Sequence, residues 1–434
     1  MALNEAGRAW LRLQAQLENL PLVHGDWRYS RRPGRGDPSQ GWKIHVSATV
    51  LSAAEVLRRV DPILRKCDAF YKVPSRPELL ASLNSGLPDF SQVGKFLTVY
   101  PRSVEEATNL ARELDKVTRG LPGPRIPFDA QYRKKSLVHY RYGAFRSSSN
   151  GRDCICDLRG KRFPDLRAPG RAVPSWLEDP FNKRDRKRTL PKGPIGVDLL
   201  AYKARAQRGK GGVYQALDLS ISPPRLVMIK EGRRHGETDW SGADGYSRIR
   251  HEARVLRALE RADVPVPKIL REFVQNGNRY LVLERITDRP LLAAKRIQPP
   301  RTSWLRAARI LEQLEPLLSK LHAAGWVWCD CKPSHIFLRK GKLRVIDFEG
   351  ACRISETDLL PWGSPDYIPP GYRGKFSRRA GTREDDYALG VVAFQFLSGK
   401  FPPISSRRRA SIYKNARCPD SLRSRIESLL GRGK

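Results

Sequence analysis

Acidic residues are scarce in this sequence of 434 residues: 45 Asp and Glu stand against 81 Lys and Arg, which gives a formal net charge of +36. Such an excess attracts polyanions, including nucleic acid, anionic lipid, acidic peptides and phosphate groups. Long apolar runs are absent too, since no stretch approaches the roughly 18 residues that a membrane-spanning helix needs. Residues 1–20 carry scattered charges and lack the apolar centre of a secretory signal. We therefore expect a cytoplasmic protein with no membrane partner.

Cysteine is also sparse, and the seven cysteines form no disulfide pattern. Their odd number is typical of a protein in a reducing compartment. Hydrophobic residues nevertheless amount to 40% of the chain, which is enough to build cores and excludes a mainly disordered protein. The length predicts two or three domains.

The first part of the chain, residues 1–145, predicts one α+β domain. Short β-like runs lie at 44–50 and 95–100. Residues 103–118 place charges on one face and apolar side chains on the other, as an amphipathic helix does.

The composition changes after residue 145. Residues 146–195 are rich in Arg, Lys, Pro, Gly and Ser, which predicts a basic linker. The linker ends in the run Asn182–Arg188, which is either a solvated charge cluster or a nucleic-acid-binding tail. Regular structure resumes at residue 196, with strand-like segments first and helical segments later. These segments lie at 213–219, 226–230 and 279–284 for strands and at 247–260, 304–322 and 385–397 for helices.

The second half carries the residue types of a protein kinase in the order that a kinase site needs. Lys230 ends a strand-like run, as does the lysine that binds the α- and β-phosphates of a nucleotide. Glu252 follows 22 residues later in a helical run, where it could pair with that lysine. Two further candidates for the nucleotide site are the glycine-rich segment Gly211, Gly212 and Val213, and Glu284 in a hinge-like position.

The catalytic residues of a kinase have counterparts further along the chain. Asp330 is expected to accept the proton of the substrate hydroxyl, and Lys332 to neutralise charge on the transferred phosphoryl group. Asp347 is the expected Mg²⁺ ligand, with His335 at the position of a second ligand. The sequence thus predicts a bilobal kinase-like fold, with an N-lobe over 196–290, a C-lobe over 291–434, and ATP or another nucleoside triphosphate as cofactor.

Four departures from the kinase pattern leave a pseudokinase as the alternative. The glycine-rich loop is incomplete, and Trp328 replaces the usual histidine of the catalytic loop. His335 replaces an asparagine, although a neutral imidazole binds Mg²⁺ poorly. Gly371 replaces the glutamate that anchors the activation segment. Cys329 and Cys331 near His335 suggest zinc, but no fourth ligand is evident and we do not expect a zinc site.

In the N-terminal domain, Lys43 and His45 are two residues apart on a strand, so their side chains emerge on the same face. If they converge with Lys72, Lys95 and Arg141, the domain contains a cationic pocket suited to phosphate. A lysine among other cations has a lowered pKa and can act as a general base, while a histidine protonates a leaving phosphate. The pocket would then eliminate phosphate from a phosphorylated Ser or Thr. The alternative is that these lysines are isolated and solvated.

Several motifs resemble class III and class IV lanthipeptide synthetases, and the resemblance covers about residues 40–145 and 196–395. The N-terminal segments are similar to the lyase domain of that family, and the second half is similar to the kinase domain that follows it there. The segments concerned are Gly41–Ala48, Gly94–Pro101, Leu121–Pro124, His139–Phe145, Gly211–Tyr214 and Ile346–Glu349.

The resemblance implies a phosphothreonine-lyase-like α+β domain and a kinase that together dehydrate Ser and Thr in a ribosomally synthesised precursor peptide. It implies that His45 is the general acid and Lys72 the base, and that three cations clamp the phosphate. These clamp residues are Lys43, Lys95 and Arg141.

The family continues into a zinc-binding cyclase domain, whereas the sequence ends soon after the kinase-like C-lobe. Either a separate cyclase or another tailoring enzyme acts as a partner, or the product keeps its dehydro residues. One alternative function is a Ser/Thr kinase or pseudokinase with a basic, non-catalytic, peptide-binding N-terminal module. Nucleic acid is not an expected partner, because aromatic residues are not interleaved with the basic ones.

Overall fold

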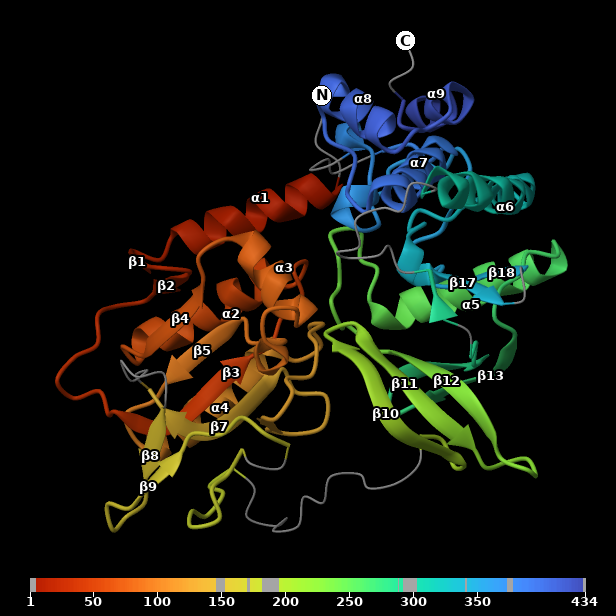
Figure 1. The fold of residues 1–434 in the computed structure, drawn as a ribbon. Helices are drawn as coiled ribbons and strands as arrows, with labels where there is room; N and C mark the ends of the chain where they lie inside the picture. The colour runs from red at the N-terminus through yellow and green to blue at the C-terminus, as the bar shows by residue number, and fades with distance from the viewer. Residues whose placement is uncertain are drawn as a thin grey trace. The chain divides into compact units, whose positions relative to one another are not determined.

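The computed structural model describes residues 5–145, 153–169, 172–181, 195–287, 289–291, 303–339, 342–372 and 378–431 (Figure 1). The chain forms two compact units. The first consists of Met1–Arg225, Ile229–Ser247 and Phe273–Tyr280, and the second of Leu226–Met228, Arg248–Glu272 and Leu281–Lys434.

The N-terminal domain is built on a seven-stranded sheet with the strand order β1-β2-β4-β5-β3-β7-β6. The strands are β1 Leu22–His24, β2 Trp27–Tyr29, β3 Gln40–Val46, β4 Phe70–Pro74, β5 Leu97–Tyr100, β6 Ala130–Gln131 and β7 Val138–Ala144. The helices are α1 Glu5–Glu18, α2 Ala53–Lys66, α3 Pro77–Ser85 and α4 Val104–Thr118, and a 3₁₀ turn, η1, spans Phe90–Gln92. The expected α+β fold class is confirmed for this domain.

The predicted amphipathic helix is α4, and its first turn shows why it begins where it does. The Ser103 hydroxyl accepts a hydrogen bond from the Glu106 backbone N–H at 3.1 Å, and Glu105 and Glu106 place negative charge at the N-terminus. Leu110 and Leu114 are buried against the sheet. Helix α4 therefore covers one face of the sheet and leaves the other face to the polar residues.

Strand register divides the central strands into an apolar and a polar face. Ile44 lies opposite Val99 and Tyr140, and all three side chains belong to the core with the helices. Because neighbouring residues in a strand point to opposite faces, Lys43 and His45 emerge on the other side. The sheet therefore presents its charged residues together on the face away from the core.

The stretch expected to be a linker packs on this domain over much of its length. Strands β8 Cys154–Cys156 and β9 Arg162–Pro164 form a hairpin. Ala172 joins the hydrophobic core, and the ring centroid of Phe181 lies 4.1 Å from that of Tyr140. The Tyr140 hydroxyl also donates a hydrogen bond to Asp179 at 2.7 Å. Residues 153–169 and 172–181 thus differ from a linker because they bury apolar surface, while the basic run Asn182–Arg188 lies outside the described residues.

A five-stranded sheet has the order β10-β11-β12-β14-β13 and includes the three strands predicted after residue 196. Its strands are β10 Leu199–Arg208, β11 Gly211–Asp218, β12 Arg225–Gly232, β13 Ile269–Gln275 and β14 Asn278–Glu284. Gly211 is required in β11 because its φ is +156° and a Cβ there would lie 1.7 Å from the Glu231 carbonyl oxygen.

The second unit is mainly helical. Its helices are α5 Gly245–Arg261, α6 Ser303–Ala323, α7 Arg383–Ser398, α8 Ser406–Asn415 and α9 Asp420–Leu429. Short strands are β15 Arg289–Pro290, β16 Trp326–Val327, β17 Ile336–Arg339, β18 Lys342–Val345 and β19 Cys352–Arg353, and 3₁₀ turns are η2 Pro333–His335, η3 Pro365–Tyr367 and η4 Pro370–Tyr372. Helix α7 is buried almost all round from Tyr387 onward, where its sequence is nearly all apolar. Within the described residues, no helix is long and apolar enough to cross a membrane.

Candidate active sites

The seven-stranded sheet brings the five predicted N-terminal residues to one pocket. The pocket is lined by Lys43, His45, Lys72, Lys95 and Arg141, together with Trp27, Gln92, Thr98, Tyr100 and Arg167. Register explains the convergence of four of them, while Lys95 lies in the segment that precedes β5. Lys72 in β4 lies opposite Thr98 in β5, which lies opposite His45 in β3, and Lys43 lies opposite Arg141 in β7. Directly opposed residues share a face, so this row of side chains points the same way.

A buried carboxylate orients the histidine of this pocket. His45 Nδ1 lies 2.6 Å from Asp129 Oδ2, and Lys95 Nζ lies 3.7 Å from the other oxygen of Asp129. Because a carboxylate accepts hydrogen bonds, His45 Nδ1 carries the hydrogen and donates it to Asp129. Asp129 makes no contact with the other ring nitrogen, Nε2. Burial, opposed by Asp129 and assisted by the charges of Lys95 and Lys43, lowers the pKa of His45 to about 3. The ring is therefore neutral near pH 7 in the free protein.

The pKa values of all three lysines in the pocket are lowered. Burial, with added repulsion from Arg167 and Lys95, lowers the pKa of Lys72 to about 8. Burial likewise lowers the pKa of Lys43 to about 7, although Asp165 opposes this effect, and it lowers the pKa of Lys95. Lys72 Nζ lies 3.9 Å from the centroid of the Trp27 ring, which fixes the position of the amine. A substantial neutral fraction of Lys72 near neutral pH suits a general base.

The guanidinium of Arg141 is held by a residue from the stretch that the sequence predicts to be a linker. It forms a buried ion pair with Asp165 and also donates to the Leu166 carbonyl oxygen at 3.3 Å. Asp165 further accepts from the Ala144 backbone N–H at 3.0 Å. Arg141 is thus fixed at the pocket wall with much of its charge balanced.

Arg167 is a pocket cation that sequence reasoning missed. It lies 3.5 Å from Asp89 and also lines a neighbouring cavity formed with Phe90, Phe128 and Asp153. Its position within an Arg-rich stretch gave no signal that distinguished it from the other arginines there.

His139 lies opposite His45 on the same face of the sheet, but its ring nitrogens form hydrogen bonds to the backbone. Its Nδ1 donates to the Leu137 carbonyl oxygen at 3.0 Å, and its Nε2 accepts from the Ile126 backbone N–H at 3.4 Å. Burial lowers the pKa of His139 to about 4. Both ring nitrogens therefore serve the fold.

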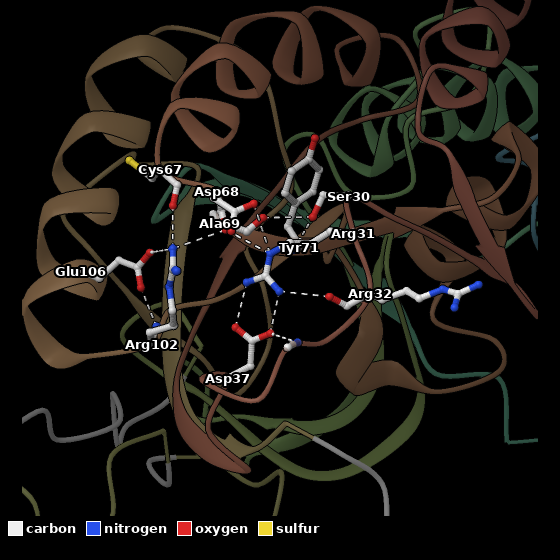
Figure 2. Close-up of polar contacts among 11 residues, drawn as sticks. Ser30, Arg31, Arg32, Asp37, Cys67, Asp68, Ala69, Tyr71, Arg102 and Glu106 are labelled. Carbon is white, nitrogen blue, oxygen red and sulfur yellow. Dashed lines mark hydrogen bonds and ion pairs between the residues drawn. The ribbon is translucent and has the colours of Figure 1, made fainter.

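A stack of aromatic rings supports Tyr100 at the pocket wall. The Phe70 ring stacks between Tyr29 and Tyr100, with centroid distances of 5.8 and 5.2 Å. The Arg31 guanidinium lies 5.4 Å from the centroid of Phe70. Figure 2 shows how Arg31 is held: it forms two hydrogen bonds to Asp37, at 2.6 and 2.8 Å, and donates to the Asp68 carbonyl oxygen at 3.0 Å. These contacts hold the loop between β2 and β3 in place.

The second site lies in the helical unit, where the predicted catalytic-loop residues meet. Lys332 Nζ lies 2.9 Å from Asp330 Oδ2 and donates to the Ser364 hydroxyl at 2.8 Å. The Ser364 backbone N–H in turn donates to Asp330 Oδ1 at 3.2 Å. This arrangement orients the carboxylate of Asp330 and brings the segment that contains Ser364 to the catalytic loop.

Trp328 performs a packing role at the position of the usual histidine. Its ring stacks on Phe348 with a centroid distance of 5.4 Å, and its Nε1–H donates to the Asp347 carbonyl oxygen at 3.0 Å. Glu252 accepts a hydrogen bond from the Phe348 backbone N–H at 3.1 Å. The peptide bond that follows Asp347 is therefore held at its carbonyl oxygen and at its N–H.

His335 lies beside both acidic residues of this site. Its Nδ1 lies 3.1 Å from the Asp330 carbonyl oxygen, and its Nε2 lies 3.3 Å from Asp347 Oδ2. The three side chains offer one atom each within 4.8 Å of one another, a donor set that fits a divalent cation.

The remaining predicted nucleotide residues occupy separate elements. Gly211, Gly212 and Val213 begin β11, and Lys230 lies in β12. The carboxylate of Glu284 is held by Arg344, with N–O distances of 2.7 and 2.8 Å.

The cysteines do not assemble with His335. Cys329 Sγ lies 3.4 Å from Cys352 Sγ, and the pKa of the Cys329 thiol is raised by this contact and by burial. Burial also raises the pKa of the Cys331 thiol.

Comparison with known families assigns both halves of the chain. A family model described as "RamC, N-terminal domain" matches residues 19–192, and one described as "Protein kinase domain" matches residues 207–428, more than half of the chain. The chain belongs to the protein kinase family. This kinase carries a RamC N-terminal domain before its kinase domain, so the predicted tandem is confirmed, and nucleotide binding follows from the kinase domain.

Individual relatives match either the tandem or the kinase half. The kinase is 31% identical over 394 residues to the Probable SapB synthase of Streptomyces coelicolor, a match that covers 85% of this chain and 40% of the relative. It is 30% identical over 222 residues to the serine/threonine-protein kinase PknA of Mycobacterium tuberculosis, covering 48% of this chain and 49% of PknA. The chain thus spans less than half the length of these two relatives.

Proposed function

We propose that this protein dehydrates Ser and Thr residues of a ribosomally synthesised precursor peptide in two steps, phosphorylation by the kinase domain and elimination of phosphate by the N-terminal domain. The observation that carries the proposal is the pocket in which Lys43, His45, Lys72, Lys95 and Arg141 converge. A kinase domain alone does not need such a pocket, whereas a phosphopeptide lyase does.

For the elimination step, neutral Lys72 takes the α-proton of the phosphorylated residue. The electron pair of the Cα–H bond forms the Cα=Cβ bond, the Cβ–O bond breaks, and phosphate leaves. The negative charge of the bound phosphate raises the pKa of His45, so that its Nε2 can carry the proton given to the departing oxygen. Asp129 keeps the ring in this orientation. The products are dehydroalanine from Ser and dehydrobutyrine from Thr.

The cations beside His45 have a separate role, because phosphate carries negative charge throughout the reaction. A bound phosphate raises the lowered pKa values of Lys43 and Lys95 and keeps both amines charged. Because both residues are almost fully buried, their charges act in a medium of low dielectric constant. Arg141 is fixed by Asp165 and adds directional donors. These three residues are proposed to bind the phosphate and stabilise it as it leaves.

For the phosphorylation step, Asp330 accepts the proton of the substrate hydroxyl, and Lys332 neutralises charge on the transferred group. Lys230, Glu252, Glu284 and the segment Gly211, Gly212 and Val213 are proposed to hold ATP or another nucleoside triphosphate. Asp347 offers the carboxylate that Mg²⁺ prefers, and the bound ion would neutralise phosphate charge. We further propose that the substrate is a precursor peptide and that a separate cyclase or other tailoring enzyme is a partner. The proposed location is the cytoplasm.

The elimination half can be tested without nucleotide. Purified protein is incubated with a short synthetic phosphoserine peptide and its phosphothreonine counterpart, and mass spectrometry follows the loss of phosphoric acid. Added thiol traps the dehydro residue. We expect elimination by the wild type and by the control variants Lys116→Ala and His24→Ala, which alter exposed residues. Elimination should disappear in Lys72→Ala and His45→Ala.

Failure of the wild type to eliminate, with nucleotide binding intact, would overturn the proposal. That result would favour the alternative, a Ser/Thr kinase or pseudokinase whose N-terminal domain only binds peptide. Normal elimination by Lys72→Ala would leave the lyase in place and remove Lys72 as its base.

A further inference from the structure

A second cavity, here called the flanking cavity, adjoins the phosphate pocket in the N-terminal domain. It has a volume of about 420 Å³, and Arg167 lines both this cavity and the phosphate pocket. Asp165 lines the flanking cavity and forms an ion pair with Arg141 of the phosphate pocket. The two cavities are therefore neighbours along residues 165–167. The other side chains that decide the chemistry of the flanking cavity are Asp89, Phe90, Phe128, Asp153 and Leu166.

Three apolar side chains line the flanking cavity. The ring centroids of Phe90 and Phe128 lie 5.9 Å apart with the ring planes at 76°, which is an edge-to-face pair. Leu166 is 50% exposed. An apolar side chain that entered the cavity would cover Leu166 and pack against the two rings, and the removal of this apolar surface from water is favourable.

The backbone of Phe128 places its ring at this cavity in a strained conformation. Its φ is +66°, a left-handed value that bulky residues rarely adopt and that glycine adopts without strain. The next residue, Asp129, forms the contact with His45 in the phosphate pocket. One turn thus supplies consecutive side chains to the two cavities, the carboxylate to the general acid and the aromatic ring to the flanking cavity.

The charges of the flanking cavity differ in sign from those of the phosphate pocket. Among the described residues, its lining contains three carboxylates, of Asp89, Asp153 and Asp165, and one guanidinium, of Arg167. Arg167 lies 3.5 Å from Asp89, so their charges partly cancel. The carboxylate of Asp165 is balanced by Arg141. This lining does not attract an acidic side chain, and it suits a neutral, apolar one.

A phosphorylated residue in the phosphate pocket brings its neighbours in the peptide close to the flanking cavity, since consecutive Cα atoms are only about 3.8 Å apart. We propose that the flanking cavity binds a bulky apolar side chain of the substrate peptide, within two positions of the phosphorylated residue. Phe90, Phe128 and Leu166 then select which phosphorylated residues undergo elimination. This inference rests on the proposed function and adds a sequence preference to its elimination step.

The experiment measures elimination by the full chain from synthetic phosphoserine peptides with alanine at the neighbouring positions. Each position from two residues before to two residues after the phosphoserine is changed in turn to Leu, Phe, Glu or Lys. We expect one position at which Leu or Phe raises kcat/KM at least about tenfold over Ala. The gain should lie mainly in KM, because this contact is remote from the reacting bonds. Glu at the same position should lower kcat/KM.

Variants of Leu166 connect this preference to the flanking cavity. In Leu166→Ala the ratio of kcat/KM for the leucine and alanine peptides should fall at least about threefold. Leu166→Lys brings a cation into the cavity, so the glutamate peptide should become a better substrate than the leucine peptide. The matched control Leu158→Ala changes a leucine that is 91% exposed in the turn between β8 and β9, and it should keep the wild-type preference.

Three results would overturn the inference while leaving the lyase in place. The first is an equal kcat/KM for the alanine, leucine and phenylalanine peptides at every position. The second is a preference for Lys or Glu over Leu in the wild type. The third is a leucine preference that both Leu166 variants retain in full, which would assign the preference to another part of the domain. Absence of elimination from all the peptides would instead overturn this inference together with the proposed function.

Discussion

Asp129 fixes the ring of His45 in the phosphate pocket, with 2.6 Å between its Oδ2 and the ring Nδ1 and with both side chains almost inaccessible to water. A histidine that both donates and accepts protons needs one defined tautomer, and a carboxylate on Nδ1 provides it. The same carboxylate balances part of the charge of Lys95. Asp129 is therefore a positioning residue for the elimination step.

Replacing this carboxylate by an amide should damage catalysis more than substrate binding. In Asp129→Asn the ring is no longer held in one tautomer by a charged acceptor, and we expect kcat for phosphoserine elimination to fall about 10²-fold. KM should change by less than about threefold. Circular dichroism checks that the variant is folded. A kcat equal to that of the wild type would show that Asp129 does not position the general acid.

The two halves should be separable by mutation. Asp330→Asn and Asp347→Asn each remove a carboxylate from the kinase site, and we expect phosphorylation of a Ser-containing peptide to fall at least about 10²-fold. Elimination from a synthetic phosphopeptide should continue at the wild-type rate, because both residues lie outside the phosphate pocket. Phosphate release and peptide mass, measured on the same samples, distinguish the two steps. Parallel loss of both activities would contradict the assignment.

Much of the phosphate pocket could be predicted from sequence because four of its five predicted residues lie on strands. The alternation of Lys43 and His45 showed that they share a face, and the resemblance to lanthipeptide synthetases identified Lys72 as a candidate. Period-two alternation cannot reveal which strands are neighbours, however. Only the observed register shows that Lys72 and His45 lie on either side of Thr98.

The acidic partners and Arg167 were missed for a different physical reason. Asp129 follows Phe128, whose φ of +66° belongs to a turn, and Asp165 and Arg167 lie in irregular chain. No periodicity marks such positions. An arginine in an Arg-rich stretch also resembles a solvated charge until its folded position is known. Sequence therefore indicated the cations that lie on strands or just before one, and not the groups that orient or balance them.

Stability in acid should depend on the buried histidines. Burial lowers the pKa of His45 to about 3 and that of His139 to about 4, whereas an unfolded chain has values near 6.5. Between about pH 6.5 and pH 4 the unfolded chain takes up protons that the folded domain excludes, so stability falls as the pH falls. Each histidine contributes at most about 1.4 kcal/mol per pH unit in this window.

Thermal unfolding followed between pH 4.5 and pH 7.5 tests this expectation. His45→Gln removes one titrating group while its side-chain amide can still donate to Asp129, so its melting temperature should fall less steeply with acid than that of the wild type. His24→Gln alters an exposed histidine and should follow the wild-type slope. Identical slopes for all three proteins would contradict the exclusion of protons by His45.

The pH dependence of elimination should report Lys72 and respond to Arg167. The base must be neutral, so the limb of the pH profile that reports Lys72 should lie near pH 8, the value to which burial and Arg167 lower its pKa. Arg167→Gln removes a repelling cation, which raises the pKa of Lys72 and moves this limb to higher pH. The control Arg112→Gln changes an exposed arginine on α4, which packs on the opposite face of the sheet, and should leave the profile unchanged. A limb that stays in place in Arg167→Gln, with only KM increased, would assign Arg167 to substrate binding alone.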